Sequence, residues 1–208
     1  MVSLFFSAFA ALFTVVNPLG AVPVFLAMTG SYSREERTRL SRNTSLYFML
    51  ILLAFFIAGN VILNFFGLSL NALRIAGGLI ILNSGYSLLA GHTSRDRISE
   101  ESEEEAMHKE DISFTPLAMP LLSGPGSISL LIGYFAETTD WAYRGVIAGA
   151  IVVMAVVVYF ILRSAPYLYR LLGVGGLQAL SRIMGFLVMS IGIQYIIAGM
   201  VSLVQSFL

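Results

Sequence analysis

Two short segments combine proline, glycine and small polar side chains inside otherwise apolar sequence. They are Asn17-Pro18-Leu19-Gly20 and Ser123-Gly124-Pro125-Gly126. Proline removes a backbone donor and glycine frees the backbone, so each segment predicts a break in a helix. A break leaves unpaired N–H groups at the start of the second half-helix and unpaired carbonyls at the end of the first. Because the N–H end favours anions and the carbonyl end favours cations, two such breaks could hold a small zwitterion.

Small side chains beside the breaks add hydrogen-bonding groups and leave space for a small ligand only. The alternative interpretation is a pair of structural kinks, since proline and glycine are tolerated in membrane helices. Two breaks at matching positions favour a binding site instead. The candidate substrate-binding residues are Thr14, Asn17, Pro18, Leu19, Gly20, Ser123, Gly124, Pro125, Gly126 and Ser127.

The composition indicates the environment of these segments. Of 208 residues, 57% are hydrophobic and 12% are charged, whereas soluble domains carry roughly 25% charged residues. This excludes an ordinary globular protein, and the absence of cysteine excludes disulfides and thiol chemistry. Apolar runs of roughly 18 or more residues predict membrane-spanning helices. Six such runs cover 2–29, 46–66, 70–90, 114–136, 145–162 and 183–208.

The order of motifs repeats along the chain, and the repeat predicts the architecture. Arg74-Ile75-Ala76-Gly77-Gly78-Leu79 in the third run is similar to Arg182-Ile183-Met184-Gly185-Phe186-Leu187 in the sixth. Each follows its proline-glycine break at nearly the same distance. Since each half has three spans, the second half must enter the membrane from the opposite side. We therefore expect an all-α polytopic protein whose six helices form a 3+3 inverted-topology repeat, with helices one and four broken.

The basic residues predict the orientation in the membrane. Nine arginines and lysines fall in loops 31–43, 91–113 and 163–181, and one falls in the loops between them. Basic loops stay in the cytoplasm, so we expect these three there and both termini outside. The expected parts are a first repeat over 1–90, a polar cytoplasmic loop over 91–113 and a second repeat over 114–208. We expect a prokaryotic plasma (inner) membrane location.

Other polar residues of the apolar runs have two interpretations each. Arg74 and Arg182 could gate the substrate or bind its carboxylate, or they could anchor helix ends and head groups. Asn83 and Gln194 are expected to be buried amides that join helices, with substrate binding as the alternative. Acids, lysines and histidines are absent from the runs except at their ends. This argues against an enzyme or a metal site. If transport is coupled to an ion, the ion would bind free backbone carbonyls or use a titratable residue near the end of a run, such as Glu137.

Four motifs together resemble the signatures of the MarC family of prokaryotic membrane proteins. The resemblance rests on residues 17–23, 73–80, 116–126 and 175–186, which contain both breaks and both arginine motifs. Members of its small neutral amino-acid transporter (Snat-type) branch carry glycine and alanine, driven by an ion gradient. The resemblance implies the matching positions Asn17, Pro18, Gly20, Gly124, Pro125 and Gly126 as the site.

These observations lead to one hypothesis and two rivals. The leading hypothesis is an ion-coupled secondary transporter of small neutral amino acids, which holds its substrate at the midplane between the broken helices. It needs no cofactor beyond a coupling proton or sodium ion, and its partners are a small zwitterionic amino acid and the lipid bilayer, with no nucleic acid. The rivals are an exporter of another small metabolite or ion, and a non-transporting membrane scaffold. The oligomeric state stays open.

Overall fold

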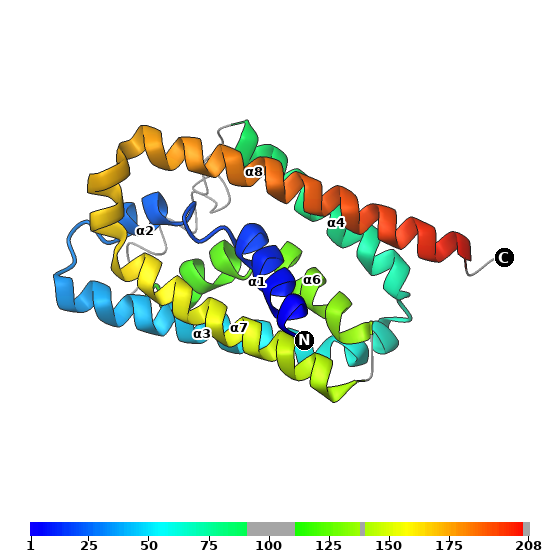
Figure 1. Ribbon diagram of the computed structural model, residues 1–208. Coiled ribbons are helices and arrows are strands. Elements are labelled where there is room, and N and C mark those ends of the chain that lie inside the picture. Colours follow the sequence, from blue (N-terminus) through cyan, green and yellow to red (C-terminus); the bar gives the residue numbers. More distant parts are fainter. Residues whose placement is uncertain (91–110, 138–139, 206–208) are drawn as a thin grey trace.

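The structure is a computed structural model that describes residues 1–90, 111–137 and 140–205. Within these residues the regular structure is helical throughout, in keeping with the expected all-α class (Figure 1). The predicted polar loop 91–113 lies mostly outside the described residues. The helices are α1 (Val2–Val16), α2 (Val22–Met28), α3 (Arg34–Phe66), α4 (Leu70–Leu89), η2 (Ser113–Leu122), α6 (Pro125–Ala136), α7 (Trp141–Arg163) and α8 (Ala165–Gln205).

Among the described residues, four helices are long and apolar enough to cross a membrane, namely α3, α4, α7 and α8. The pair η2 and α6 is bent by 68° and makes a fifth candidate if it counts as one span. The predicted breaks in the first and fourth runs are confirmed, because residues 17–21 separate α1 from α2 and residues 123–124 separate η2 from α6. The chain is therefore a multi-pass membrane protein with four to five candidate spans.

Helices extend further into the basic segments than the apolar runs predicted. The expected loop 31–43 is mostly the first turns of α3, which begins with a capping box between Ser33 and Glu36. The expected loop 163–181 is largely the start of α8, which is kinked at Gly173 with φ 64°. Both expectations of a loop are wrong. A capping box lets α3 begin ahead of its apolar run, and α8 continues through the kink at Gly173.

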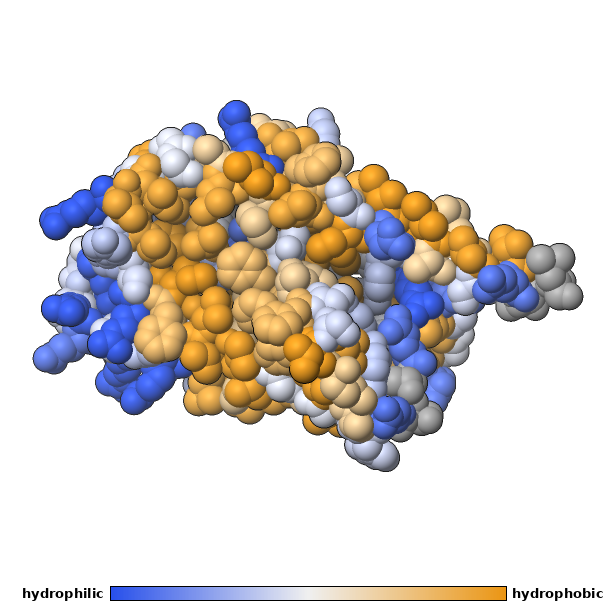
Figure 2. Space-filling model, viewed as in Figure 1, coloured by the Kyte–Doolittle hydropathy of each residue, from blue (hydrophilic) through white to orange (hydrophobic). Residues whose placement is uncertain are grey.

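Two groups of helices make up the molecule. The main buried core joins α1, α2, α3, η2, α6, α7 and the start of α8, with Phe25, Phe48 and Met154 fully buried. A small separate cluster of Ile81, Leu88 and Val188 belongs to the long pair α4 and α8, which runs along one side of the molecule (Figure 1). Figure 2 shows hydrophobic surface across the middle of this view and hydrophilic residues at its ends. The fold therefore places a seam between the core and the α4/α8 pair.

Glycines allow the backbones of α4 and α8 to pack in direct contact. A Cβ added at Gly78 would lie 2.8 Å from the carbonyl oxygen of Gly192, and one at Gly85 would lie 2.7 Å from that of Gly185. The two contacts run in opposite directions along the chain, so the helices are antiparallel. Small residues let membrane helices approach this closely, where packing replaces the hydrophobic effect as the main source of stability.

We predict that Gly85→Leu destabilises the protein by about 1–3 kcal/mol or more, because the new side chain has to push apart two backbones. The measurement is thermal unfolding in detergent. The matched control is Gly149→Leu in α7, where an added Cβ meets nothing within 4 Å. Equal unfolding midpoints for both variants would contradict the close packing of α4 and α8.

Candidate functional site

The first break is organised by Asn17. This residue has left-handed backbone angles (φ 47°, ψ 61°), and its N–H donates to the carbonyl of Phe13, which ends α1. The Gly20 N–H donates to the Asn17 backbone oxygen at 3.0 Å and faces its side-chain Oδ1 at 3.3 Å. A Cβ at Gly20 would collide with the Asn17 amide nitrogen. Asn17 is 3% exposed, so in this conformation the first break satisfies part of its own backbone and is closed.

Thr14 shares this closed arrangement. Its hydroxyl donates to the carbonyl of Ala10 in its own helix, and the side chain is buried. Pro18 is also buried, and Leu19 is half-buried. Thr14 and Pro18 are therefore enclosed by the protein in the observed conformation.

The second break has a different local structure. The half before it, η2, is irregular, with extended backbone angles at Thr115 and Met119. Gly124 is the N-cap of α6 and Pro125 its first residue, the position where a missing N–H costs nothing. The Ser127 hydroxyl donates to the Gly124 carbonyl at 2.8 Å. The Ser123 side chain is fully buried, and its Oγ has no hydrogen-bond partner within the described part of the chain.

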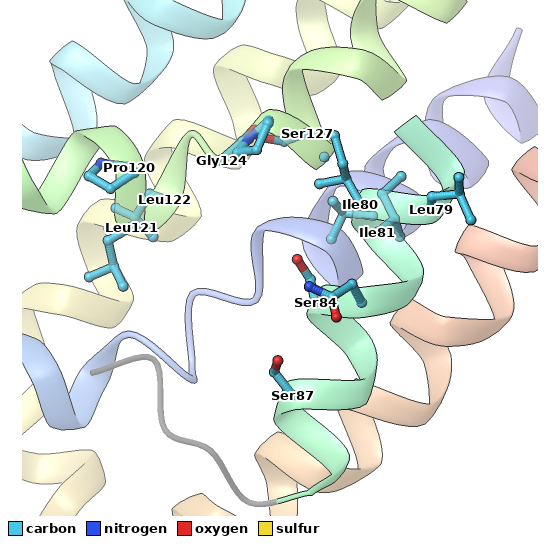
Figure 3. A pocket seen from close by; sticks show the side chains of 14 residues that line it. Leu79, Ile80, Ile81, Ser84, Ser87, Pro120, Leu121, Leu122, Gly124 and Ser127 are labelled. Atoms are coloured by element: carbon cyan, nitrogen blue, oxygen red, sulfur yellow. The ribbon is translucent and has the colours of Figure 1, made fainter. Parts of the chain in front are cut away.

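A cavity of about 550 Å³ lies between the second break and α4. Ser84 and Ser87 lie along α4 on the side of the broken helix, across from Gly124 and Ser127 (Figure 3). The end of α1 reaches the cavity through Val15. The full lining is Val15, Leu79, Ile80, Ile81, Asn83, Ser84, Ser87, Pro120, Leu121, Leu122, Gly124, Pro125, Gly126 and Ser127. Among the described residues, the lining carries small polar groups and no charged side chain.

The structure brings only part of the predicted site to this cavity. Gly124, Pro125, Gly126 and Ser127 line it, together with Asn83. The predicted residues outside the lining are Thr14, Asn17, Pro18, Leu19, Gly20, Ser123, Arg74, Arg182 and Gln194. The sequence analysis missed Ser84 and Ser87, although Asn83, Ser84 and Ser87 are closely spaced polar residues within an apolar helix.

The expectation that Asn83 and Gln194 are buried amides is wrong, because both are exposed in the structure. Asn83 faces the cavity, while Gln194 lies on the outer surface of α8. The apolar runs indicate only that these residues lie far from the ends of their helices. Whether their side chains are buried depends on which face of the helix packs against a neighbour.

A polar cluster ties four helices together at the end of α6. Arg74 Nη2 pairs with Glu137 Oε1 at 2.7 Å, and the Tyr143 hydroxyl donates to the other Glu137 oxygen at 2.9 Å. Tyr195 of α8 donates to the carbonyl of Ser129, whose own hydroxyl donates to the Leu73 carbonyl. α4, α6, α7 and α8 are thereby connected, whereas Arg182, the sequence counterpart of Arg74, is exposed.

The apolar bundle, the bent helix and the cavity beside it define a polytopic helical membrane protein with an open, partly polar cavity next to a broken helix. Residues 2–204 match the sequence model described as the MarC family integral membrane protein. The chain therefore belongs to the MarC family.

Named relatives cover nearly the whole chain. A UPF0056 membrane protein of Buchnera aphidicola (subsp. Schizaphis graminum) is 38% identical over 99% of this chain and 96% of its own. The UPF0056 membrane protein MJ1677 of Methanocaldococcus jannaschii is 37% identical, covering 94% and 95%. The UPF0056 inner membrane protein MarC of Salmonella typhimurium is 35% identical, covering 94% and 93%. These names give a membrane location and no substrate. No solved structure matches the chain.

We predict that Arg74→Ala lowers stability by about 1–3 kcal/mol, because it leaves the Glu137 carboxylate without its cation in a partly buried cluster. Thermal unfolding of the purified protein in detergent measures this change. Arg182→Ala is the matched control at the equivalent position of the second motif, and we expect it to unfold like the wild type. An equal loss of stability in both variants would show that the ion pair with Glu137 makes no specific contribution to stability.

Proposed function

We propose that this MarC family member is an ion-coupled secondary transporter that binds a small neutral amino acid in the cavity at the second break. The observation that supports it most is the cavity itself, which lies between two apolar helices and is bounded by an interrupted helix. Its volume of about 550 Å³ falls within the ~300–1,000 Å³ usual for small-molecule sites. Interrupted helices that border such cavities are typical of secondary transporters.

The chemistry of the lining favours a small zwitterion with no net charge. The substrate carboxylate would face the N-terminus of α6 at Gly126 and Ser127, where free N–H groups and the helix dipole favour an anion. The ammonium group would face the oxygens of Asn83 and Ser87 across the cavity. Because no charged side chain lines the cavity, a ligand with an excess charge would remain uncompensated in a low dielectric. Glycine and alanine fit these demands.

The packing supports the proposed 3+3 inverted repeat of six spans. α3 lies against α7, and α4 lies against α8, so corresponding helices of the two halves pair with each other. With Arg74 aligned to Arg182, exchanging the halves maps the contact of Gly78 with Gly192 onto positions 186 and 84, one residue from the observed contact of Gly185 with Gly85. In the proposed cycle the α4/α8 pair and the core move against each other at the seam, which exposes the cavity to each side in turn.

The closed first break fits this cycle as the partner site of the opposite-facing state. Asn17 would then release Gly20 and open the turn between α1 and α2, while the second break closes. Coupling would use a proton or a sodium ion, at backbone carbonyls or at Glu137. The proposed orientation puts the arginine-rich end of α3 in the cytoplasm, as the distribution of basic residues predicts.

The test is uptake of labelled glycine and alanine into proteoliposomes, with a proton gradient, a sodium gradient or neither. We expect gradient-driven uptake by the wild type and at least a tenfold loss in Gly126→Leu, because a Cβ at this position already lies 3.0 Å from Ile81 and a longer side chain would fill the space beside it. Gly149→Leu is the control for reconstitution, since its added side chain meets open space.

Two outcomes would overturn the proposal. Uptake at the level of empty liposomes for all small amino acids would exclude the substrate class and favour export of another metabolite or an ion. Equal uptake by Gly126→Leu and Gly149→Leu would mean that transport does not pass through this cavity. A non-transporting scaffold predicts no uptake together with a normal fold in both variants.

A further inference from the structure

A second cavity, of about 360 Å³, lies at the opposite end of the bundle from the Glu137 cluster. It is lined by Arg34, Arg37, Thr38, Arg163, Ser164, Pro166 and Tyr167, where the start of α3 meets the junction of α7 and α8. Arg34, Arg37 and Thr38 are three and four residues apart and share one face of α3. Three guanidinium groups thus converge on one cavity from two segments that are far apart in the sequence.

The positive charge of this cavity is not neutralised by the described part of the chain. No carboxylate of the described residues pairs with Arg34, Arg37 or Arg163. The one ion pair among these residues joins Arg74 and Glu137. Arg37 uses two of its nitrogens to cap the end of α2, through the carbonyls of Thr29 and Gly30. Arg163 donates to the hydroxyl of Tyr159. Within the described residues, the Arg34 side chain has no hydrogen bond or ion pair, and Arg37 and Arg163 keep further N–H donors.

The capped N-terminus of α3 adds little to this site. The Ser33 side chain already accepts from the Glu36 N–H, and the Glu36 carboxylate accepts from the Ser33 N–H. The attraction for an anion therefore comes from the arginines. Guanidinium groups present planar donors that match the oxygens of phosphate. Ser164 adds a small polar side chain to the lining, whereas the Thr38 hydroxyl already donates to the Arg34 carbonyl.

The position of the cavity places it at the surface of the membrane. α3 has 33 residues, or about 50 Å at ~1.5 Å per residue, which exceeds a hydrocarbon core about 30 Å thick. Its first turns, with Arg34 and Arg37, therefore extend to the level of the lipid head groups. Figure 2 shows hydrophilic residues at this end of the molecule, beside hydrophobic surface.

Exposed apolar residues lie next to the arginines at the start of α8. Tyr167 and Leu171 are both 66% exposed, and Val174 is 54% exposed. Inorganic phosphate would make no contact with these apolar side chains. A phospholipid can place its head group on the arginines and its acyl chains along them. Basic pockets between helices at the membrane surface are suited to anionic lipid head groups.

We propose that this cavity binds the phosphate head group of an anionic phospholipid. Arg34 and Arg163 bind the phosphate oxygens, and Arg37 positions the start of α3 against α2 while it contributes charge. This lipid joins the start of α3 to the α7/α8 junction. The inference is independent of the substrate proposed for the cavity at the second break.

The experiment measures binding of short-chain phosphatidylglycerol to the purified full-length protein in neutral detergent, by native mass spectrometry and by thermal shift. The variants are Arg34→Gln, Arg163→Gln and the double variant, and Arg37 is left intact because it caps α2. An arginine near an anionic lipid surface contributes about 1 kcal/mol, or about fivefold in affinity. We therefore expect about fivefold weaker binding in each single variant and about 25-fold in the double variant.

The controls separate the possible sources of the phosphate. Arg182→Gln changes an exposed arginine elsewhere and should bind like the wild type. Phosphatidylcholine should bind at least tenfold more weakly than phosphatidylglycerol, and inorganic phosphate should give no shift at the same concentrations. Equal phosphatidylglycerol binding by the double variant and the wild type would overturn the proposal. Inorganic phosphate binding as tightly as the lipid would identify a soluble anion instead and overturn the lipid assignment.

Discussion

A bilayer offers the protein backbone no hydrogen-bond partners, so every irregular segment within it has to be satisfied by the chain or by a bound polar group. The two breaks meet this constraint differently. At the first, Asn17 takes a left-handed conformation and closes the turn onto Gly20 with its own backbone and side chain. At the second, Gly124 and Ser127 border an open cavity, and the buried hydroxyl of nearby Ser123 lacks a partner within the described residues. Of the two, the second break is therefore where we propose that a polar ligand binds.

The position of that cavity follows from the way α4 and α8 pack. Their glycine contacts allow backbone-to-backbone approach, so the pair behaves as one body with its own small buried cluster. α6 reaches this body through Ser129, next to Gly77, and through the backbone that Tyr195 contacts. The cavity thus lies where the second break meets the α4/α8 pair, which is where the proposed transport cycle requires movement.

Local chemistry predicted some parts of this structure, and long-range packing decided the others. The breaks could be predicted because proline and glycine act on their own turn of helix. The start of α3 at Arg34 is also a local signal, the capping box of Ser33 and Glu36. A search for apolar runs does not detect it, because the cap consists of polar residues. The α4 wall of the cavity, with Ser84 and Ser87, depends on which face of α4 meets the second break. The closed state of the first break depends on one side-chain conformation of Asn17. Neither can be derived from the spacing of residues.

The most direct test of the central claim is equilibrium binding of labelled alanine to the purified protein in detergent, which depends on the cavity and on no gradient. The account predicts saturable binding by the wild type that unlabelled glycine displaces, retained in Gly149→Leu and lost in Gly126→Leu. Undiminished binding by Gly126→Leu, or no saturable binding of small neutral amino acids by the folded wild type, would contradict it.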